Sequence, residues 1–325
     1  MSKNIYSLIN KDRVYMKILF THELFPPDIA GGGEVTVYEI VKRLKERNVD
    51  LIVLCSGNPK IKEYKGIETF RLPVNRYLFN FAFHWIYRYA KKFKPDLIHT
   101  NNYNACFPSY VVAKTIKRPI LCHIHEVYNE KWLKMRGPIF GTFSRIVERL
   151  QVRHDFDKFI FFSSFMRDSA VRIGIPKERT EVIKPGVNWK KFKVGKKEPF
   201  VLFVGNLIKR KGLDYLIEAA KRLNNVEFLI VGRGPERNRL EKIATPNVKF
   251  LGYVPTETLI DLYSRALVFC LPSIGEGFGI VLLEAMASGC AIVSTIPLDY
   301  EGFKVGMGNV DQLVDSIDWL IKNQK

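Results

Sequence analysis

Short apolar runs alternate with amphipathic stretches along the whole chain. Runs rich in Val, Ile, Leu and Phe predict buried strands, and apolar residues spaced three and four positions apart predict helices. Strands and helices that take turns in this way are typical of βαβ units and of parallel sheets. The sequence therefore predicts an α/β protein.

The same pattern occurs twice, once in each half of the chain. In the first half the strands are predicted at 17–22, 50–55, 96–100, 120–125 and 158–163, and the helices at 33–47, 76–94, 104–117, 140–156 and 164–173. In the second half the strands are predicted at 200–205, 226–231, 248–251, 267–271 and 291–294, and the helices at 212–223, 235–243, 257–265, 279–288 and 310–323.

A stretch without periodicity separates the two halves. It runs from Lys184 to Pro199 and is rich in Pro, Gly and Lys, as linkers are. We therefore predict an N-terminal domain over residues 1–186, a linker over 187–198 and a second domain over 199–325. Both are expected to be Rossmann-like, doubly wound domains that face each other across a cleft, with ligands beyond the carboxyl ends of their strands.

The charge is concentrated in the first domain. The chain of 325 residues has 51 Lys+Arg and 33 Asp+Glu, a net charge of +18, and residues 199–325 hold 14 of each sign. A basic domain could bind nucleic acid, an anionic membrane or a phosphorylated acceptor, or the charge could simply keep the protein in solution. No recognised nucleic-acid-binding motif accompanies the charge, so we expect no nucleic-acid partner.

The cysteines and the hydropathy indicate a cytoplasmic protein. The five cysteines are odd in number, widely spaced and never arranged as Cys-x-x-Cys, which argues against a disulfide framework and a structural zinc site. No apolar run approaches the roughly 18 residues of a membrane span, and the first residues lack the apolar stretch of a secretion signal. We expect the chain to work in the reducing cytosol.

The segment from Leu271 to Gly289 is the strongest candidate site. A strand ends there, a glycine-rich turn follows, and a helix begins near Gly279, so free backbone N–H groups and the positive end of the helix are expected at the ligand edge. Glu284 lies inside this helix among apolar residues and needs a hydrogen-bond partner, such as the diol of a ribose. Glu276 lies in the loop and is expected to be free to bind a second polyol. An ordinary helix with one salt-bridged glutamate is the alternative.

A second candidate site follows the strand at 200–205. Three cations, Lys209, Arg210 and Lys211, lie directly before the predicted start of a helix. Positive charges beside backbone N–H groups suit a diphosphate, and we expect Lys211 to contact it. Taken alone, the cluster could also be a solvated turn.

Several motifs together resemble the donor domain of retaining glycosyltransferase family 4. They are Glu-x7-Glu at 276–284, Gly-x-Leu-x3-Lys-Gly at 205–212, Val-Gly-Arg-Gly-Pro-Glu at 231–236 and Phe-Leu-Gly-Tyr-Val at 250–254. In the first half, the glycine-rich stretch 25–34 and the pair His125-Glu126 are similar to further motifs of the family. The resemblance implies the GT-B architecture and metal-independent transfer of a sugar from a nucleotide-sugar with retained anomeric configuration.

By this resemblance, Lys211 would hold the diphosphate, Glu284 the ribose hydroxyls and Glu276 the transferred sugar. His125 would contact the donor sugar or the acceptor, so the expected catalytic residues are Glu276, His125 and Lys211. The expected donor-binding residues are Gly32, Gly33, Gly205, Asn206, Lys209, Arg210, Gly232, Tyr253, Val254, Gly277, Phe278, Gly279 and Glu284. Asn206 stands where the family commonly has an arginine, so Lys209 or Arg210 is expected to supply that charge.

No metal and no cofactor are expected at the site. His123 and His125 could form a metal pair on one strand face, but no cluster of cysteines or carboxylates lies near them in the sequence. The partners that the sequence predicts are therefore a nucleotide-sugar and an acceptor, which is either a lipid or a glycan.

The segment 76–94 carries aromatic residues on more than one helical face. One core-facing stripe cannot use them all, although much of the set could be domain core. Aromatics flanked by Lys and Arg are typical of a helix that lies in a membrane interface. We therefore expect peripheral association with the anionic inner face of the cell membrane. A non-catalytic protein of the same fold, which binds a nucleotide-sugar or acts as a scaffold, is the alternative function.

Overall fold

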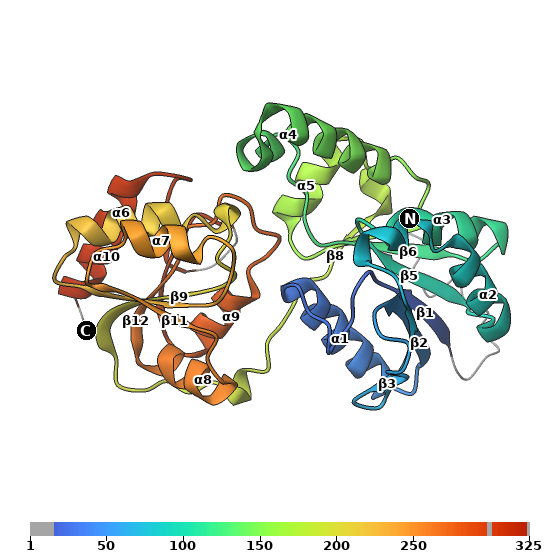
Figure 1. Cartoon of the computed structure of the whole chain (residues 1–325), viewed down its shortest axis with the longest axis horizontal. Coiled ribbons are helices and arrows are strands. Elements are labelled where there is room, and N and C mark those ends of the chain that lie inside the picture. The colour runs from blue at the N-terminus through green and yellow to red at the C-terminus, as the bar shows by residue number, and fades with distance from the viewer. Residues whose placement is uncertain (1–15, 298–300, 324–325) are drawn as a thin grey trace. The chain divides into compact units, whose positions relative to one another are not determined.

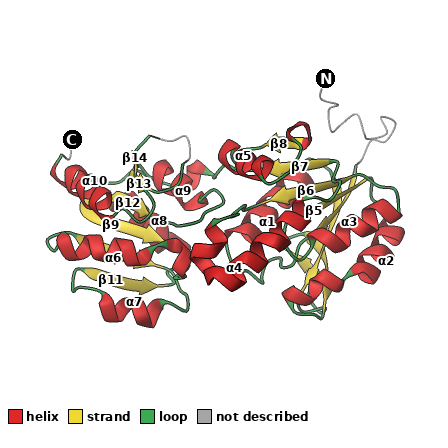
Figure 2. Cartoon of the chain, turned by 90° about the horizontal axis from the view of Figure 1, so that it is seen from above, coloured by secondary structure: helices red, strands yellow, loops and turns green. Residues whose placement is uncertain are grey.

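The computed structural model describes residues 16–297 and 301–323, so the prediction for the first residues of the chain lies outside the described part. The described residues form two compact units (Figure 1). One unit contains the residues up to Asn129 and Thr142–Lys184, and the other contains Glu130–Gly141 and the residues from Pro185 onward. Each unit has its own largely parallel sheet with helices on both faces, which confirms the predicted α/β class (Figure 2).

The first unit is built on an eight-stranded sheet in the order β3-β4-β2-β1-β5-β6-β7-β8. All neighbouring strands are parallel except β3 and β4. The strands are β1 (Lys17–Thr21), β2 (Asp50–Ser56), β3 (Glu63–Tyr64), β4 (Ile67–Leu72), β5 (Leu97–Asn101), β6 (Ile120–Ile124), β7 (Lys158–Phe161) and β8 (Thr180–Val182).

The α-helices that follow these strands are α1 (Gly32–Lys45), α2 (Phe83–Phe93), α3 (Cys106–Thr115), α4 (Lys131–Val152) and α5 (Ser164–Arg172). Shorter 3₁₀ helices are η2 (Arg76–Phe81), η3 (Lys177–Arg179) and, in the second unit, η4 (Trp189–Lys191) and η5 (Lys209–Lys211). The α1 helix packs on the core through Val37 and Val41, which lie one turn apart and are both buried.

Two helix predictions in the first unit were wrong. Residues 76–94 form η2 and α2 rather than one helix: Asn75 caps the first turn by accepting a hydrogen bond from the Tyr77 N–H, and the tighter 3₁₀ winding places Phe79 in the core. The α4 helix begins at Lys131, well before the predicted position 140, and it is kinked at Gly137, which has φ +74°. Pro138 then begins the second segment of α4, the position in a helix that proline tolerates best.

The second unit is built on a six-stranded parallel sheet in the order β11-β10-β9-β12-β13-β14. Its strands are β9 (Glu198–Val204), β10 (Glu227–Val231), β11 (Val248–Gly252), β12 (Ala266–Leu271), β13 (Ala291–Ser294) and β14 (Phe303–Lys304). Its helices are α6 (Leu213–Arg222), α7 (Arg237–Ile243), α8 (Thr256–Arg265), α9 (Ile280–Ala287) and α10 (Val310–Lys322). In Figure 1, α6 and α7 lie on one face of this sheet and α8 lies on the other.

The middle of the second sheet is its core. Val201 of β9 lies in register with Phe228 of β10 and Val268 of β12, and all three side chains are buried. Runs of apolar residues without alternation are expected for strands covered on both faces, which is why the sequence predicted them well.

The strand order places a switch point in each sheet. In the second sheet β9 lies between β10 and β12, and in the first sheet β1 lies between β2 and β5. The connections that leave β9 and β12 in the second sheet therefore run to opposite faces, as do those that leave β1 and β5 in the first sheet. The loops after each pair of strands open side by side at the carboxyl edge. The candidate site residues of each unit lie at these two edges.

Candidate functional site

Three loops meet at the carboxyl edge of the second sheet: residues 205–212 after β9, 232–234 after β10 and 272–279 after β12. A Cβ atom on Gly232, which has φ +144°, would lie 1.8 Å from the carbonyl oxygen of Gly205. A Cβ atom on Gly212, which has φ +68°, would lie 2.1 Å from the carbonyl oxygen of Pro272. Only glycine allows the loops to pack this closely, so the predicted glycines hold the three loops together.

Lys211 and Glu276 form an ion pair between two of these loops. Both side chains are only 11% exposed, and Ser273 Oγ lies 3.5 Å from the same Glu276 carboxylate oxygen. Burial alone would raise the pKa of Glu276, but the positive charges of Lys211 and Arg210 and the hydrogen bonds from Lys211 and Ser273 hold it below its ordinary value. The prediction that Glu276 is free to meet a ligand was therefore wrong: in this structure Lys211 binds it.

The other groups of the predicted anion site surround this pair. Arg210 Nη1 donates a 3.1 Å hydrogen bond to the Gly275 carbonyl, and the Ile274 N–H donates a 2.8 Å hydrogen bond to the Arg210 carbonyl. The α9 helix begins directly after Gly279, and no side chain caps its first turn. Gly277 and Phe278 lead into this turn. Asn206 and Lys209 are exposed in the 205–212 loop after β9. Cationic side chains and the positive end of a helix thus converge at one edge.

Glu284 lies one turn into α9 and binds the side chain of Tyr263, which was not among the predicted site residues. The Tyr263 hydroxyl, on a fully buried side chain of α8, donates a 2.9 Å hydrogen bond to Glu284 Oε2. Burial raises the pKa of Glu284, and the hydrogen bond from Tyr263 opposes part of that rise. Among residues 16–297 and 301–323, Glu284 Oε1 has no hydrogen-bond partner, so this oxygen is able to accept a hydrogen bond from a ligand.

An exposed aromatic residue lies at the same edge. Tyr253 follows β11, is 68% exposed, and has the Arg233 guanidinium 5.3 Å from its ring centre. Val254 beside it is half-buried. A planar cation over an aromatic ring is a surface on which a flat base can stack. Arg233 was missed as a site residue, although its place between the two glycines of the 232–234 loop was a signal.

In the first unit, His125 follows β6 and lies beside the start of α1. Its Nε2–H donates a 2.7 Å hydrogen bond to Asn101 Oδ1, and its backbone N–H donates to Asn102 Oδ1 at 3.2 Å. This arrangement leaves Nδ1 as the acceptor, and a Cβ built on Gly33 would lie 4.0 Å from it. The structure thus brings the predicted His125 and Gly33 together. Around Gly32, a Cβ would meet nothing within 4 Å.

His125, which is half-buried, belongs to a stack with two buried histidines, His123 and His99. The rings of His123 and His125 are nearly parallel with centres 4.8 Å apart, and His99 lies 5.9 Å from His123. Burial and the neighbouring histidines lower the pKa of His125 to about 3, and burial lowers the pKa of His99 to about 4. The pKa of His123 is also lowered by burial, well below its usual range. The imidazoles are therefore neutral at physiological pH, and His125 acts as a hydrogen-bond acceptor rather than as a cation.

Within the described ranges, no group of three or more His, Cys, Asp or Glu side chains is placed to hold a metal ion.

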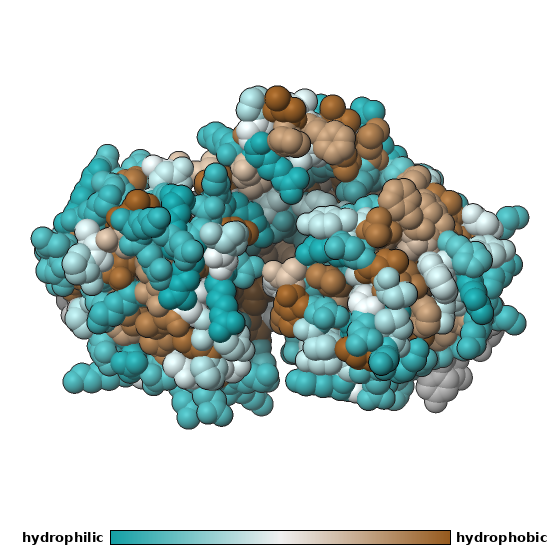
Figure 3. Space-filling model, in the orientation of Figure 1, coloured by the Kyte–Doolittle hydropathy of each residue, from teal (hydrophilic) through white to brown (hydrophobic). Residues whose placement is uncertain are grey.

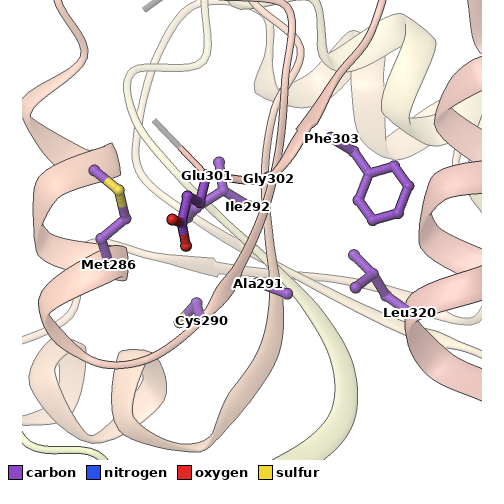
Figure 4. Close-up of a pocket in the computed structure, with 8 residues that line it drawn as sticks. All are labelled: Met286, Cys290, Ala291, Ile292, Glu301, Gly302, Phe303 and Leu320. Atoms are coloured by element: carbon purple, nitrogen blue, oxygen red, sulfur yellow. The ribbon is translucent and has the colours of Figure 1, made fainter. Parts of the chain in front are cut away.

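A cavity of about 340 Å³ lies at the opposite, amino-terminal end of the second sheet (Figure 4). Its lining residues are Met286, Cys290, Ala291, Ile292, Glu301, Gly302, Phe303 and Leu320. Burial raises the pKa of Cys290 to about 11, so its thiol is not a nucleophile at neutral pH. The cavity contains none of the residues of the carboxyl edge and is separate from the candidate site.

Two family models match the chain. The model of glycosyl transferases group 1 matches residues 188–325, and the model of Glycosyltransferase Family 4 matches residues 30–191. An uncharacterized glycosyltransferase of Methanocaldococcus jannaschii is 26% identical over 315 residues, which cover 86% of this chain and 80% of that protein. The phosphatidyl-myo-inositol mannosyltransferase of Mycolicibacterium smegmatis is 28% identical over 315 residues, which cover 85% of this chain and 75% of that protein.

Solved structures share the fold. The sucrose-phosphate synthase of Thermosynechococcus elongatus matches with a TM-score of 0.79 and 23% identity, over 95% of this chain and 90% of that one. Anabaena HepE in complex with UDP-glucose matches with a TM-score of 0.76 and 21% identity, over the same shares of the two chains.

Proposed function

The chain belongs to the group 1 glycosyltransferases of the GT-B type, and we propose that it moves a sugar from a nucleoside-diphosphate donor to a lipid-linked or glycan acceptor with retention of configuration. One observation carries the donor half of this proposal. Lys211, Arg210 and the uncapped start of α9 lie in the loops at the switch point of the second sheet, together with Glu276, and Glu284 lies one turn into α9. A diphosphate needs such cations, and a sugar and a ribose need such carboxylates.

In the proposed complex the Lys211–Glu276 pair opens. The Lys211 ammonium then pairs with the diphosphate instead of with Glu276, because two negatively charged phosphates attract it more strongly than one carboxylate does. Glu276 then becomes free to accept hydrogen bonds from hydroxyls of the transferred sugar. As the bond to the sugar breaks, negative charge grows on the leaving phosphate oxygen, and Lys211, Arg210 and the N–H groups of α9 stabilise that charge.

Glu284 and the exposed ring at Tyr253 complete the donor site in this proposal. Tyr263 occupies one oxygen of Glu284, and the other oxygen accepts a ribose hydroxyl. The base stacks against Tyr253 and Arg233, flanked by Gly232 and Val254. The complex of HepE with UDP-glucose, a protein of the same fold, supports a uridine or similar nucleotide.

On the acceptor side, His125 accepts a hydrogen bond from a hydroxyl through Nδ1, and Gly32 and Gly33 let the substrate approach the start of α1. We propose that no metal takes part, because Lys211, Arg210 and the helix end already supply positive charge at the leaving group. A lipid-linked acceptor at the inner face of the membrane agrees with the basic first domain and with the relative named for phosphatidyl-myo-inositol.

Thermal-shift screening against UDP-, GDP- and ADP-sugars tests the donor, because a ligand of the folded state raises the melting temperature. The best donor is then incubated with membrane lipids or glycans as acceptors and with the wild type or Glu276→Gln, and release of the nucleoside diphosphate is measured. Release by the wild type that is lost in the variant supports the enzyme. Binding without release in both proteins would support the non-catalytic alternative, and no binding to any donor would contradict both.

A further inference from the structure

The second segment of α4, from Pro138 to Val152, has its polar side inside and its apolar side outside. Gly141, Ser144, Glu148 and Val152 are its buried residues. The Glu148 carboxylate accepts hydrogen bonds of 2.9 Å from the Tyr128 N–H and 2.7 Å from the Asn129 N–H. The inner side of the helix thus serves to fix a loop rather than to fill an apolar core.

The opposite side of the segment carries large apolar residues that are exposed to solvent. At about 100° per residue, three of them point in directions within about 60° of one another. They are Phe143, Ile146 and Leu150, with exposed fractions of 66%, 52% and 53%, and we call them the α4 stripe. Figure 3 shows the hydrophobic colour gathered over α4, at the top of the view. Soluble surfaces seldom carry such a row unless it binds something.

Cations accompany the α4 stripe. Residues 142–153 contain Arg145, Arg149 and Arg153, and their one acidic residue, Glu148, is buried. Arg149 and Arg153 are exposed and lie along one side of the stripe. The outer side of α4 therefore combines an apolar row with positive charge.

We propose that the α4 stripe docks the protein onto an anionic lipid surface, with α4 lying in the plane of the interface. An apolar row inserts among the acyl chains while the flanking arginines meet the phosphates of the headgroups. None of the helices in the described part of the chain is both long and apolar enough to cross a membrane, so this docking is peripheral.

The segment 76–94, expected from the sequence to be the interfacial element, is less suited to this role. Its Phe79 is fully buried, and Trp85 and Tyr89 pack on Phe70 of β4, with ring centres 6.5 Å and 3.7 Å away. Tyr77, Leu78 and Phe81 remain exposed on the short η2 helix, whereas Trp85 and Tyr87 of α2 are each only 38% exposed. The buried residues of this segment are Phe79, Ala82, Ile86 and Ala90, which pack in the core of the first unit.

This inference rests on the proposed function only for the lipid-linked acceptor, and lipid binding is measured without any donor. The full chain is sedimented with vesicles of phosphatidylcholine alone or mixed equally with phosphatidylglycerol, at low and high salt. We expect binding to the mixed vesicles that weakens with salt. The variant Phe143→Ser/Ile146→Ser is expected to bind them about 100-fold more weakly, because each large apolar side chain contributes about tenfold.

Matched variants separate the alternatives. Tyr77→Ser/Phe81→Ser removes two exposed aromatic residues of η2 and should leave vesicle binding unchanged. Arg149→Gln/Arg153→Gln should lower binding to the mixed vesicles only. Absence of wild-type binding, or loss confined to the Tyr77/Phe81 variant, would overturn the proposal. So would a wild-type dimer that the Phe143/Ile146 variant converts to a monomer with unchanged vesicle binding.

Nucleotide binding and thermal unfolding of each variant show whether the protein is folded. Exposed apolar residues can be replaced by serine without loss of core packing, so both should match the wild type. If the wild type releases the nucleoside diphosphate from the donor but does not bind vesicles, only the proposed docking surface is contradicted. If vesicle binding persists while no nucleotide binds, only the proposed function fails.

Discussion

The ammonium of Lys211 and the carboxylate of Glu276 neutralise each other at the carboxyl edge of the second sheet. They come from loops on the two central strands, β9 and β12, and they are 65 positions apart in the chain. Each is a group that the proposed sugar diphosphate would need, and here each neutralises the other. Binding of the proposed donor would therefore exchange one ion pair for another.

Glu276→Gln is therefore expected to separate binding from transfer. The neutral amide no longer neutralises Lys211, so the affinity for the nucleoside diphosphate should stay equal or rise, while donor turnover falls about 100-fold or more because the carboxylate no longer orients the sugar. Lys211→Met should lower both quantities. Calorimetric titration with the diphosphate and a turnover assay measure the two effects. Weaker diphosphate binding by Glu276→Gln would contradict the exchange.

Tyr263→Phe is expected to weaken nucleotide binding through Glu284. The hydroxyl opposes the rise that burial causes in the pKa of Glu284, so its loss should raise that pKa further. The protonated carboxyl is the poorer acceptor. Binding should therefore be lost at a higher pH in Tyr263→Phe than in the wild type as the pH is lowered, with affinity about tenfold lower near neutrality.

Titration of the dissociation constant against pH checks this prediction. The control is Glu284→Gln, whose binding should be weak and independent of pH in the same range. An unchanged inflection in Tyr263→Phe would mean that the hydroxyl does not act on the carboxylate.

The sequence predicted the parts of the fold that depend on local pattern. Continuous apolar strands such as β9 and β12 are buried on both faces, so their composition alone identifies them. The β4 strand was missed because it contains polar residues, among them Arg71, which is fully buried and donates a 2.9 Å hydrogen bond to the Phe25 carbonyl. A prediction made from neighbouring residues cannot detect a hydrogen-bond partner that lies 46 positions away in the chain.

The site was predicted to the same extent. The motif glycines and the start of α9 are local features, and the structure brings them to one edge. The ion pair of Glu276 and the hydrogen bond from Tyr263 to Glu284 join distant segments, so the sequence could say only that Glu284 needs a partner. The outward apolar side of α4 was missed because periodicity shows that a helix has two sides and not which one is covered.

Acid should destabilise the first unit through three histidines whose pKa values are low. Burial lowers the pKa of His22 and His99 to about 4 and that of His125 to about 3, whereas an unfolded histidine titrates near 6.5. The unfolded chain therefore binds more protons between these values. Stability is fully present above about pH 6.5 and falls by about 1.4 kcal/mol per pH unit for each histidine as the pH decreases toward 4.

Urea unfolding at several pH values measures this slope. His99→Phe should reduce the slope, because one buried titrating group is gone, while His84→Gln on the exposed surface should leave it as it is. A stability that is flat between neutral pH and pH 5 would show that these histidines are not held neutral.

Gly212→Ala should damage the site through the backbone. Gly212 has φ +68°, and its new Cβ would lie 2.1 Å from the Pro272 carbonyl oxygen, so the loops that carry Lys211 and Glu276 must move apart. We expect a loss of about 2 kcal/mol in the free energy of unfolding and a loss of diphosphate affinity. Gly186→Ala is the control, because a Cβ there meets nothing within 4 Å. Equal effects of the two variants would contradict the close packing of the loops.

His123→Phe should stabilise the protein. Both ring nitrogens of His123 are buried without a hydrogen-bond partner among the described residues, and its ring packs between His125 and Phe162, with centres 4.8 Å and 4.3 Å away. A phenyl ring keeps these ring contacts and removes the cost of two unsatisfied polar atoms, a gain of about 1 kcal/mol or more at neutral pH. Urea unfolding compares this variant with His123→Ala, which removes the ring and should destabilise by about 2 kcal/mol or more through the cavity it leaves. Destabilisation by both variants would mean that the His123 nitrogens do bind a partner, such as ordered water, in the folded protein.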